Sequence, residues 1–119
     1  MDLARLASEP FISPPFTDNC GRAVILACRR AGFEPNVAHE VPDYPTTLRL
    51  VSAGVGVSLV PDLGLRQVPS DVVVVDPAVP VHRTIDVVFR RSSADRPAVR
   101  AVIEAIQLVA AELSLASAQ

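Results

Sequence analysis

The sequence lacks the features of several large classes of protein. Its 119 residues hold 11 basic and 13 acidic side chains for a net charge of −2, and every basic residue is an arginine. Adjacent arginines occur as two pairs, Arg29 with Arg30 and Arg90 with Arg91. Such pairs are typical of the solvated ends of helices and strands, and they do not make the basic stripe that binds nucleic acid. We therefore expect no DNA contact from these residues themselves.

Long apolar runs and paired cysteines are also missing. No run approaches the about 20 residues that cross a bilayer, and the N-terminal MDLARLASEP has no basic segment followed by an apolar core, as a secretory signal would. Cys20 and Cys28 lie on one predicted helix at about 12 Å of rise, which is too far for a disulfide. We expect a reduced, cytoplasmic chain without a membrane partner.

Patterns that carry catalysis are missing as well. The sequence has no nucleophile elbow, phosphate-binding loop or zinc-binding spacing. His39 and Glu40 are neighbours on a predicted strand, so their side chains point to opposite faces and cannot form an acid–base pair. Asp43 has no partner with which to act as a general base. We therefore expect no enzyme activity, no metal and no cofactor.

What the chain does contain is enough apolar sequence for one core, since half of it is apolar and a fifth is charged. The most informative stretch is residues 42–62, PDYPTTLRLVSAGVGVSLVPD. Asp43 is predicted to cap a helix, and Gly54 and Gly56 to end it. Residues 57–60 are predicted to form a short buried strand.

The rest of the chain alternates between strand and helix patterns. Strands are predicted at residues 10–13, 35–41, 72–75 and 81–90, helices at 19–31 and 97–113, helical turns near the N-terminus and at 61–66, and a frayed tail after Leu113. This alternation indicates right-handed crossovers and a mostly parallel sheet with helices on both faces. The fold class is therefore α/β, with the strands at Phe11, Val37 and Val57 side by side.

Polar and proline residues collect where these three strands end. Open α/β sheets bind ligands at this edge, and the helix starts there favour an anion. The candidate ligand contacts are Ser13, Pro14, Phe16, Thr17, Asp43, Tyr44, Thr46, Val60 and Pro61. Taken singly, a Ser, Thr or Asp at a helix start is more often a cap than a ligand contact, but the topology places the set together. The expected ligand is a small carboxylate or another anionic metabolite.

Two stretches, EPFISPP and CRRAGFEPNVAHEVPDYPTTLRLVSAGVGVSLVP, resemble the carboxyl-terminal effector-binding domain of LysR-type transcriptional regulators. That family commonly shows a PFI strand, a helix closing in AGF-P, a strand ending in EV, and the motif LVAAGLGVALVP. The last motif stands here as LVSAGVGVSLVP at residues 50–61. The segment TIDVVFRR and the helix near residues 97–113 match the usual C-terminal end, so the resemblance covers nearly the whole chain.

The resemblance implies a three-layer, periplasmic-binding-protein-like (type II) fold, in which two α/β subdomains enclose an inducer. The 119 residues would be a single effector-binding-domain fragment, with residues 10–81 in the second subdomain and residues 82–119 as the crossover strand and last helix of the first. In this family the loop and helix start that often touch effector correspond to Asp43, Tyr44 and Thr46. Ser13 and Pro14 match the loop after the first strand of the second subdomain, and Val60 and Pro61 match the strand end beside the cleft.

The resemblance also implies a function and partners. Such a chain would sense a small-molecule inducer to control transcription, and would reach DNA only through a helix-turn-helix domain that these residues do not contain. The helix at 19–31 and the strand at 35–40 look like part of a homodimer surface, and uncovered apolar area would favour self-association. Two alternatives stay open: a stand-alone solute-binding or small enzymatic module on the same fold, and an interaction fragment that only dimerises.

Overall fold

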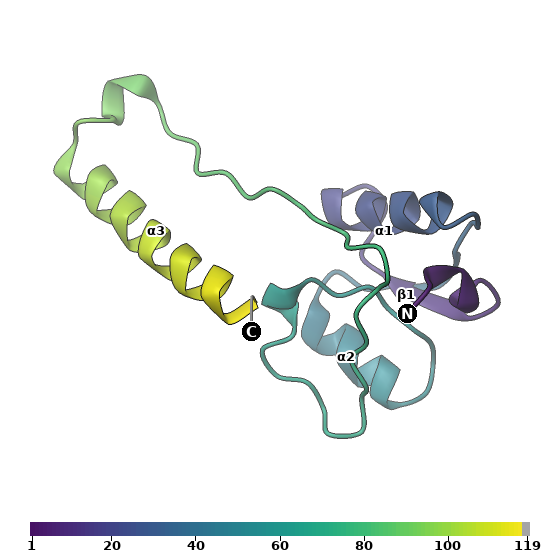
Figure 1. Ribbon diagram of the computed structural model, residues 1–119. Coiled ribbons are helices and arrows are strands. Elements are labelled where there is room, and N and C mark those ends of the chain that lie inside the picture. Colours follow the sequence, from purple (N-terminus) through teal and green to yellow (C-terminus); the bar gives the residue numbers. More distant parts are fainter. Residues whose placement is uncertain (118–119) are drawn as a thin grey trace. The chain divides into compact units, whose positions relative to one another are not determined.

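The computed structural model describes the backbone of residues 1–117 and the side chains of residues 1–114. The chain forms two compact units that divide after His82, and each is described by itself. In chain order the elements are η1 (Leu3–Leu6), β1 (Pro10–Ser13), α1 (Asn19–Arg30), β2 (Asn36–Glu40), α2 (Tyr44–Ser52), η2 (Asp62–Gly64), η3 (Arg91–Ser93) and α3 (Pro97–Ser117) (Figure 1). None of the described helices combines the length and apolarity needed to cross a membrane.

β1 is the central strand of the first unit. β2 pairs with it in parallel, with Phe11 opposite Val37. On the other side of β1, Val57 forms a parallel bridge with Phe11. The Val57 N–H donates to the Pro10 carbonyl at 2.9 Å, and the Val57 carbonyl accepts the Ile12 N–H at 2.8 Å. The prediction that Phe11, Val37 and Val57 lie side by side is confirmed.

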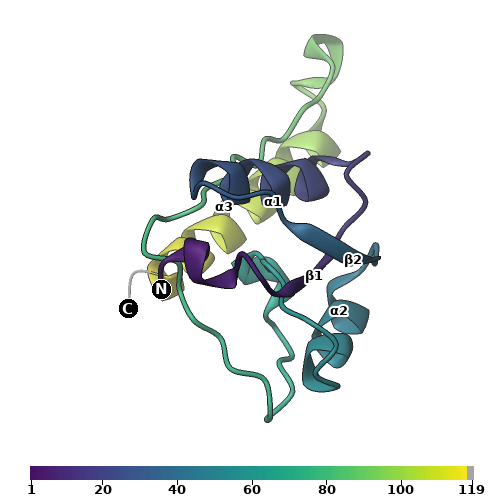
Figure 2. The same cartoon turned by 90° about the vertical axis from the view of Figure 1, so that its right-hand side faces the viewer.

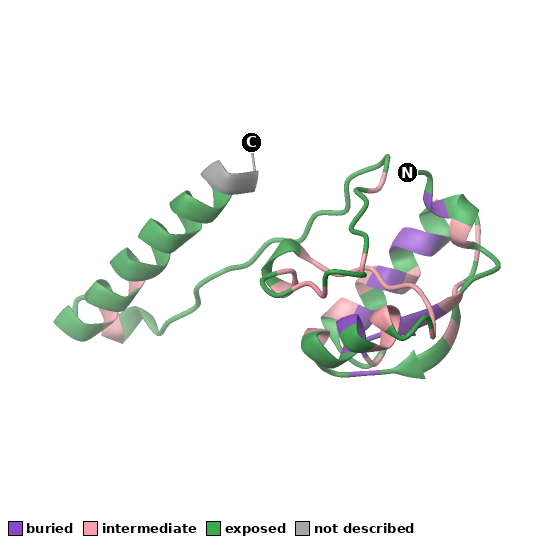
Figure 3. Cartoon of the chain, turned by 90° about the horizontal axis from the view of Figure 1, so that it is seen from below, coloured by how far each residue is buried: buried purple, intermediate pink, exposed green. Residues whose placement is uncertain are grey.

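One helix covers each face of this small sheet, as the alternating pattern predicts. α1 lies on one side of β1 and β2, and α2 lies on the other (Figures 1 and 2). Phe11 packs with Val24 and Cys28 of α1 to form the core cluster, while α2 contacts β1 and buries Leu48. The buried residues therefore gather in the first unit (Figure 3).

Asp43 and Gly54 set the two ends of α2, and Gly56 lets the following chain pass close to β1. Asp43 is the N-cap, and its carboxylate accepts the Thr46 N–H at 2.8 Å. Gly54 ends the helix with a φ of +73°, which a residue with a Cβ adopts only with strain. Gly56 does not take such a φ. It is instead needed for space, because a Cβ there would lie 2.4 Å from the Pro10 carbonyl oxygen.

Three predicted strands are wrong. The segment at 57–60 forms a single bridge at Val57, and the segments at 72–75 and 81–90 belong to no strand of the described chain. The sheet therefore has two strands instead of the larger, mostly parallel sheet that was expected. An apolar run becomes a strand only when a neighbouring strand takes up its N–H and carbonyl groups, and the described residues place no such neighbour beside these segments.

Residues 72–75 are held at their ends rather than along their length. The Ser52 hydroxyl donates to the Asp71 carboxylate at 2.7–2.8 Å, and the Ala78 N–H donates to the Met1 carbonyl at 2.7 Å. These bonds return the loop to the first unit without adding it to the sheet.

The second unit consists of an irregular segment from Arg83, then η3 and α3. α3 confirms the helix predicted at 97–113. It continues to Ser117, so the tail predicted after Leu113 is helical up to that point, and residues 118–119 lie outside the described chain. Large apolar side chains of α3 are exposed: Val102, Ile106, Leu108, Val109 and Leu113.

Candidate functional site

The carboxyl ends of β1 and β2 meet at one edge of the first unit. A hydrogen bond joins the two ends, because the Val41 N–H donates to the Ser13 carbonyl at 2.9 Å. The chain then runs directly from Val41 to Asp43 and into α2. The segments after β1 and after β2, which carry most of the predicted contacts, are thus tied together at the edge where the sequence places a ligand.

Ser13 and Pro14 are part of the buried framework of this edge. Both residues are buried, with Ser13 2% exposed. The Ser13 hydroxyl donates to the Pro14 carbonyl at 2.9 Å. Because its proton is already engaged, this hydroxyl can offer a ligand only its acceptor lone pairs.

Phe16 and Thr17 lie on the exposed loop that leads into α1, and Phe16 is 60% exposed. The Arg22 guanidinium donates to the Thr17 carbonyl at 3.2 Å. Arg22 was not predicted as a site residue. Its signal in the sequence is an arginine five positions after Thr17, in the early part of a helix that begins at the loop. It brings a positive charge to a stretch where only hydroxyls and helix starts were expected to attract an anion.

The helix starts at this edge are less available to an anion than the sequence predicts. In α2, Pro45 has no N–H, the Thr46 N–H is bound by the Asp43 carboxylate, and the Thr47 N–H donates to the Asp43 carbonyl at 3.2 Å. The bond from Thr46 is the main cause that holds the pKa of Asp43 below its usual value. Asp18 caps α1 in the same way. The two carboxylates thus occupy donors that had been assigned to a ligand.

Tyr44 and Val60 are brought together around Gly64. A Cβ on Gly64 would lie 2.8 Å from Val60 Cγ1 and 2.9 Å from two atoms of the Tyr44 ring. The Tyr44 ring and the Val60 side chain therefore both lie close to Gly64, the last residue of η2. An open hollow of about 410 Å³ lies beside the ring, between α2 and η2.

The structure divides most of the predicted contacts into three groups. The first links the chain after β1 to the chain after β2 through Ser13 and Val41, and the second places Tyr44 and Val60 close to Gly64. Phe16 and Thr17 form a third group with Arg22 and are not tied to either pair by the bonds described above. Thr46 is exposed beside Tyr44, and its hydroxyl, like its N–H, interacts with the Asp43 carboxylate and helps to lower the pKa of Asp43.

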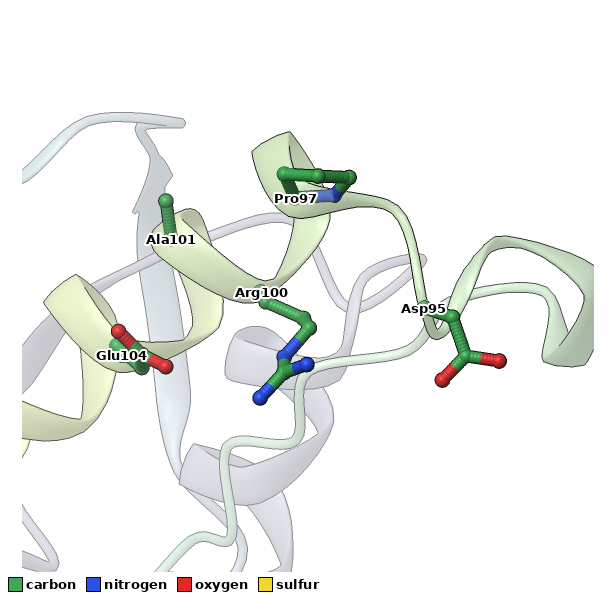
Figure 4. A pocket seen from close by; sticks show the side chains of 5 residues that line it. All are labelled: Asp95, Pro97, Arg100, Ala101 and Glu104. Atoms are coloured by element: carbon green, nitrogen blue, oxygen red, sulfur yellow. The ribbon is translucent and has the colours of Figure 1, made fainter.

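A second hollow, of about 240 Å³, lies in the second unit at the start of α3. It is lined by Asp95, Pro97, Arg100, Ala101 and Glu104, and Figure 4 shows the Arg100 side chain between the two acidic ones. Two carboxylates with one cation do not favour an anion, and no predicted contact lies there. Among the described residues, no three His, Cys, Asp or Glu side chains are grouped as a metal site.

Comparison with known proteins identifies a family. The model of the LysR substrate binding domain matches residues 1–111. The HTH-type transcriptional regulator TfdS of Cupriavidus pinatubonensis (strain JMP 134 / LMG 1197) is 45% identical over 65 residues, which are 50% of this chain and 21% of that protein. The HTH-type transcriptional regulator AlsR of Bacillus subtilis (strain 168) is 46% identical over 37 residues, which are 31% of this chain and 12% of that protein.

A longer match is to the uncharacterized HTH-type transcriptional regulator YwbI of Bacillus subtilis (strain 168). It is 30% identical over 87 residues, which are 70% of this chain and 29% of that protein. The matched part of the chain thus spans less than a third of the length of each of these relatives. Because the family model covers nearly all of the sequence, the chain belongs to the LysR substrate-binding domain family, for which a periplasmic-binding-protein-like fold of type II is implied.

Proposed function

We propose that this LysR substrate-binding chain forms part of the ligand-sensing region of a transcriptional regulator and binds a small anionic metabolite that controls transcription. The observation that carries the proposal is the Ser13–Val41 hydrogen bond at 2.9 Å, which ties the carboxyl ends of β1 and β2 into one edge. Open α/β sheets bind ligands at such an edge. DNA would be bound by a helix-turn-helix domain outside these residues, and the protein would then act in the cytoplasm with the chromosome.

The proposed contacts divide by chemistry. The exposed Thr46 side chain would contact the ligand beside Asp43, and the Tyr44 ring would contact its apolar part. Arg22, held next to Thr17 at 3.2 Å, would supply a counter-charge. The remaining proposed contacts, which shape the edge or lie in its loops, are Ser13, Pro14, Phe16, Thr17, Asp43, Val60 and Pro61.

We further propose the two-subdomain organisation of the family for this chain. Residues 10–81 would form the second subdomain and residues 82–119 the crossover strand and last helix of the first. The other wall of the ligand site would then come from residues outside these 119. In isolation the chain would hold its ligand weakly.

We also propose that the chain forms a homodimer. Leu26 of α1 is 49% exposed, and the second unit exposes a row of large apolar side chains on α3. Exposed apolar area of this kind drives association. Light scattering on the chain at tens of micromolar should give the mass of a dimer, and a monomeric mass at that concentration would contradict this part of the proposal.

The ligand proposal is tested by thermal unfolding with benzoate and with short aliphatic carboxylates. We expect small increases in Tm that are lost in the double variant Thr46→Val with Ser13→Ala, because both hydroxyls at the edge are then removed. A matched control is Thr84→Val with Ser92→Ala, which makes the same chemical changes at exposed positions of the second unit. The ligand-induced change in Tm is compared rather than Tm itself, since Ser13→Ala also removes the bond to Pro14.

An unchanged ligand-induced shift in the double variant would show that the edge does not bind the carboxylate. Equal loss in the double variant and in the control would show that the shift does not report a local site.

A further inference from the structure

The hollow between α2 and η2 is lined by residues from two segments of the chain. On the α2 side it is lined by Tyr44, Pro45 and Leu48, and on the other side by Leu63, Gly64, Arg66 and Gln67. We call it the α2–η2 hollow. Its volume of about 410 Å³ lies at the lower end of the about 300–1,000 Å³ that small-molecule sites occupy. It is therefore large enough for a compact metabolite.

Most of the apolar lining of the hollow comes from Tyr44, Leu48 and Leu63. Leu48 is 4% exposed, so its side chain is packed inside the first unit at the α2 side of the hollow. The Tyr44 ring lies close to Gly64, since two ring atoms are 2.9 Å from the position that a Cβ would take there. Leu63 is 45% exposed and presents apolar area on the opposite side. An aromatic ring and an exposed aliphatic side chain that line one hollow suit the apolar body of a ligand.

The charge of the hollow has one sign. Arg66 is its one charged lining residue, and no carboxylate lines it. Within the described part of the chain, Arg66 takes part in no ion pair or side-chain hydrogen bond. Two carboxylates are next in sequence to lining residues without lining the hollow themselves: Asp43, which caps α2, and Asp62, which begins η2. A guanidinium presents a planar set of donors that matches a carboxylate.

We propose that the α2–η2 hollow binds a small carboxylate with an apolar body, with Arg66 contacting the carboxylate and Tyr44, Leu48 and Leu63 contacting the body. This inference rests on the proposed ligand-sensing function, because Tyr44 belongs both to the sheet edge and to the hollow. It goes beyond that function by naming Arg66 and Leu63 as ligand contacts and by requiring both charge and apolar surface in one ligand.

The test is an amide NMR titration of the 119-residue chain with three probes: benzoate, benzyl alcohol and acetate. Benzoate carries both features, benzyl alcohol keeps the ring without the charge, and acetate keeps the charge without the ring. We expect benzoate to bind most tightly in the millimolar range, with the largest shifts at the amides of Leu48, Gly64 and Arg66. Equal affinities for benzoate and acetate, or no shifts at these amides, would overturn the proposal.

The affinity of Arg66 variants for benzoate is a second test of the proposal. Arg66→Gln should weaken benzoate binding about tenfold, as expected for one charge-assisted contact, and should bring it to the level of benzyl alcohol. Arg66→Lys should fall between, because it keeps the charge but loses the planar fork. Arg49→Gln is the matched control, since it removes the same charge from an exposed position of α2 outside the hollow. Equal losses in Arg66→Gln and Arg49→Gln would refute a specific contact.

The failure of this inference is distinguishable from failure of the proposed function. If Thr46→Val with Ser13→Ala abolishes benzoate binding and Arg66→Gln does not, the ligand binds at the sheet edge and the hollow is overturned. If Arg66→Gln abolishes binding and the double variant does not, the hollow stands and the edge contacts are wrong.

Discussion

The most direct test of the fold that positions the site is Gly56→Ala. Gly56 lies where the chain returns beside β1, one residue before the bridge at Val57. A Cβ at this position would lie 2.4 Å from the Pro10 carbonyl oxygen and 3.2 Å from its carbon. Both are backbone atoms of β1, so a rotamer change cannot relieve the contact. Reaching an ordinary contact of 3.4 Å requires a movement of about 1 Å.

That movement breaks the two hydrogen bonds of Val57, which are 2.9 Å to the Pro10 carbonyl and 2.8 Å from the Ile12 N–H. Their loss costs about 1–3 kcal/mol, and residual crowding adds about 1–3 kcal/mol. The alanine returns about 0.4–1 kcal/mol by restricting the unfolded chain. We therefore expect the free energy of unfolding to fall by about 1–6 kcal/mol, which is to be compared with the about 5–15 kcal/mol typical of a domain.

Urea unfolding followed by circular dichroism measures this loss, and Tyr44 fluorescence reports on the first unit because the chain has one tyrosine and no tryptophan. Gly32→Ala is the control. Gly32 has a φ of +89°, and nothing lies within 4 Å of the position that a Cβ would take there, so alanine costs about 1–2 kcal/mol of backbone strain without crowding. Replacing glycine by alanine restricts the unfolded chain equally at both positions. This contribution therefore cancels when Gly56→Ala is compared with Gly32→Ala.

A loss in Gly56→Ala no greater than that in Gly32→Ala would refute the close approach. So would unchanged hydrogen-exchange protection of the Ile12 and Val57 amides in Gly56→Ala.

Two further predictions concern the same unit. Ser58→Ala should raise the free energy of unfolding by about 1 kcal/mol, because the Ser58 Oγ is buried without a hydrogen-bond partner in the described chain; a lower urea midpoint would contradict this. Asp43→Asn should reduce the acid sensitivity of the chain. The folded state lowers the pKa of Asp43, so its stabilisation is present above the ordinary value of about 4 and is lost as pH falls through the lowered folded value. Asparagine keeps the cap but does not titrate. The urea midpoint should therefore fall less in the variant than in the unsubstituted chain as the pH is lowered from neutral to acidic. The lowered pKa of Glu34 contributes the same pH dependence to both proteins. Equal falls would show that Asp43 is not a source of the pH dependence.

The parts of the fold that the sequence predicts well have local causes. The cap at Asp43 and the left-handed turn at Gly54 depend on residues a few positions apart, and both are present. α3 follows from the spacing of its apolar residues and is also present. The strands at 72–75 and 81–90 fail because a strand depends on a partner that the pattern of its own residues does not supply.

The site shows the same division. The meeting of the ends of β1 and β2 follows from strand order and could be predicted. The role of Gly64 could not, because its spacing from Tyr44 says nothing of the ring that lies against it. Arg22 and Arg66 were likewise missed, since an arginine beside a helix is indistinguishable in sequence from a solvated one until its neighbours are known.

The two aspartate caps change which groups recognise charge at this edge. Asp18 and Asp43 each accept a backbone N–H at the start of a helix, and their charge would repel a ligand carboxylate placed there. The attraction that the sequence assigned to helix starts therefore falls to side chains, and in the first unit Arg22 and Arg66 are the cations placed beside the loop before α1 and the α2–η2 hollow. Because Arg66 is exposed and solvent ions screen such charges, the proposed recognition of an anion would depend on ionic strength, while the proposed contacts of Tyr44 and Leu63 with the apolar body would not. A ligand held in this way would be defined by its apolar shape first and by its charge second.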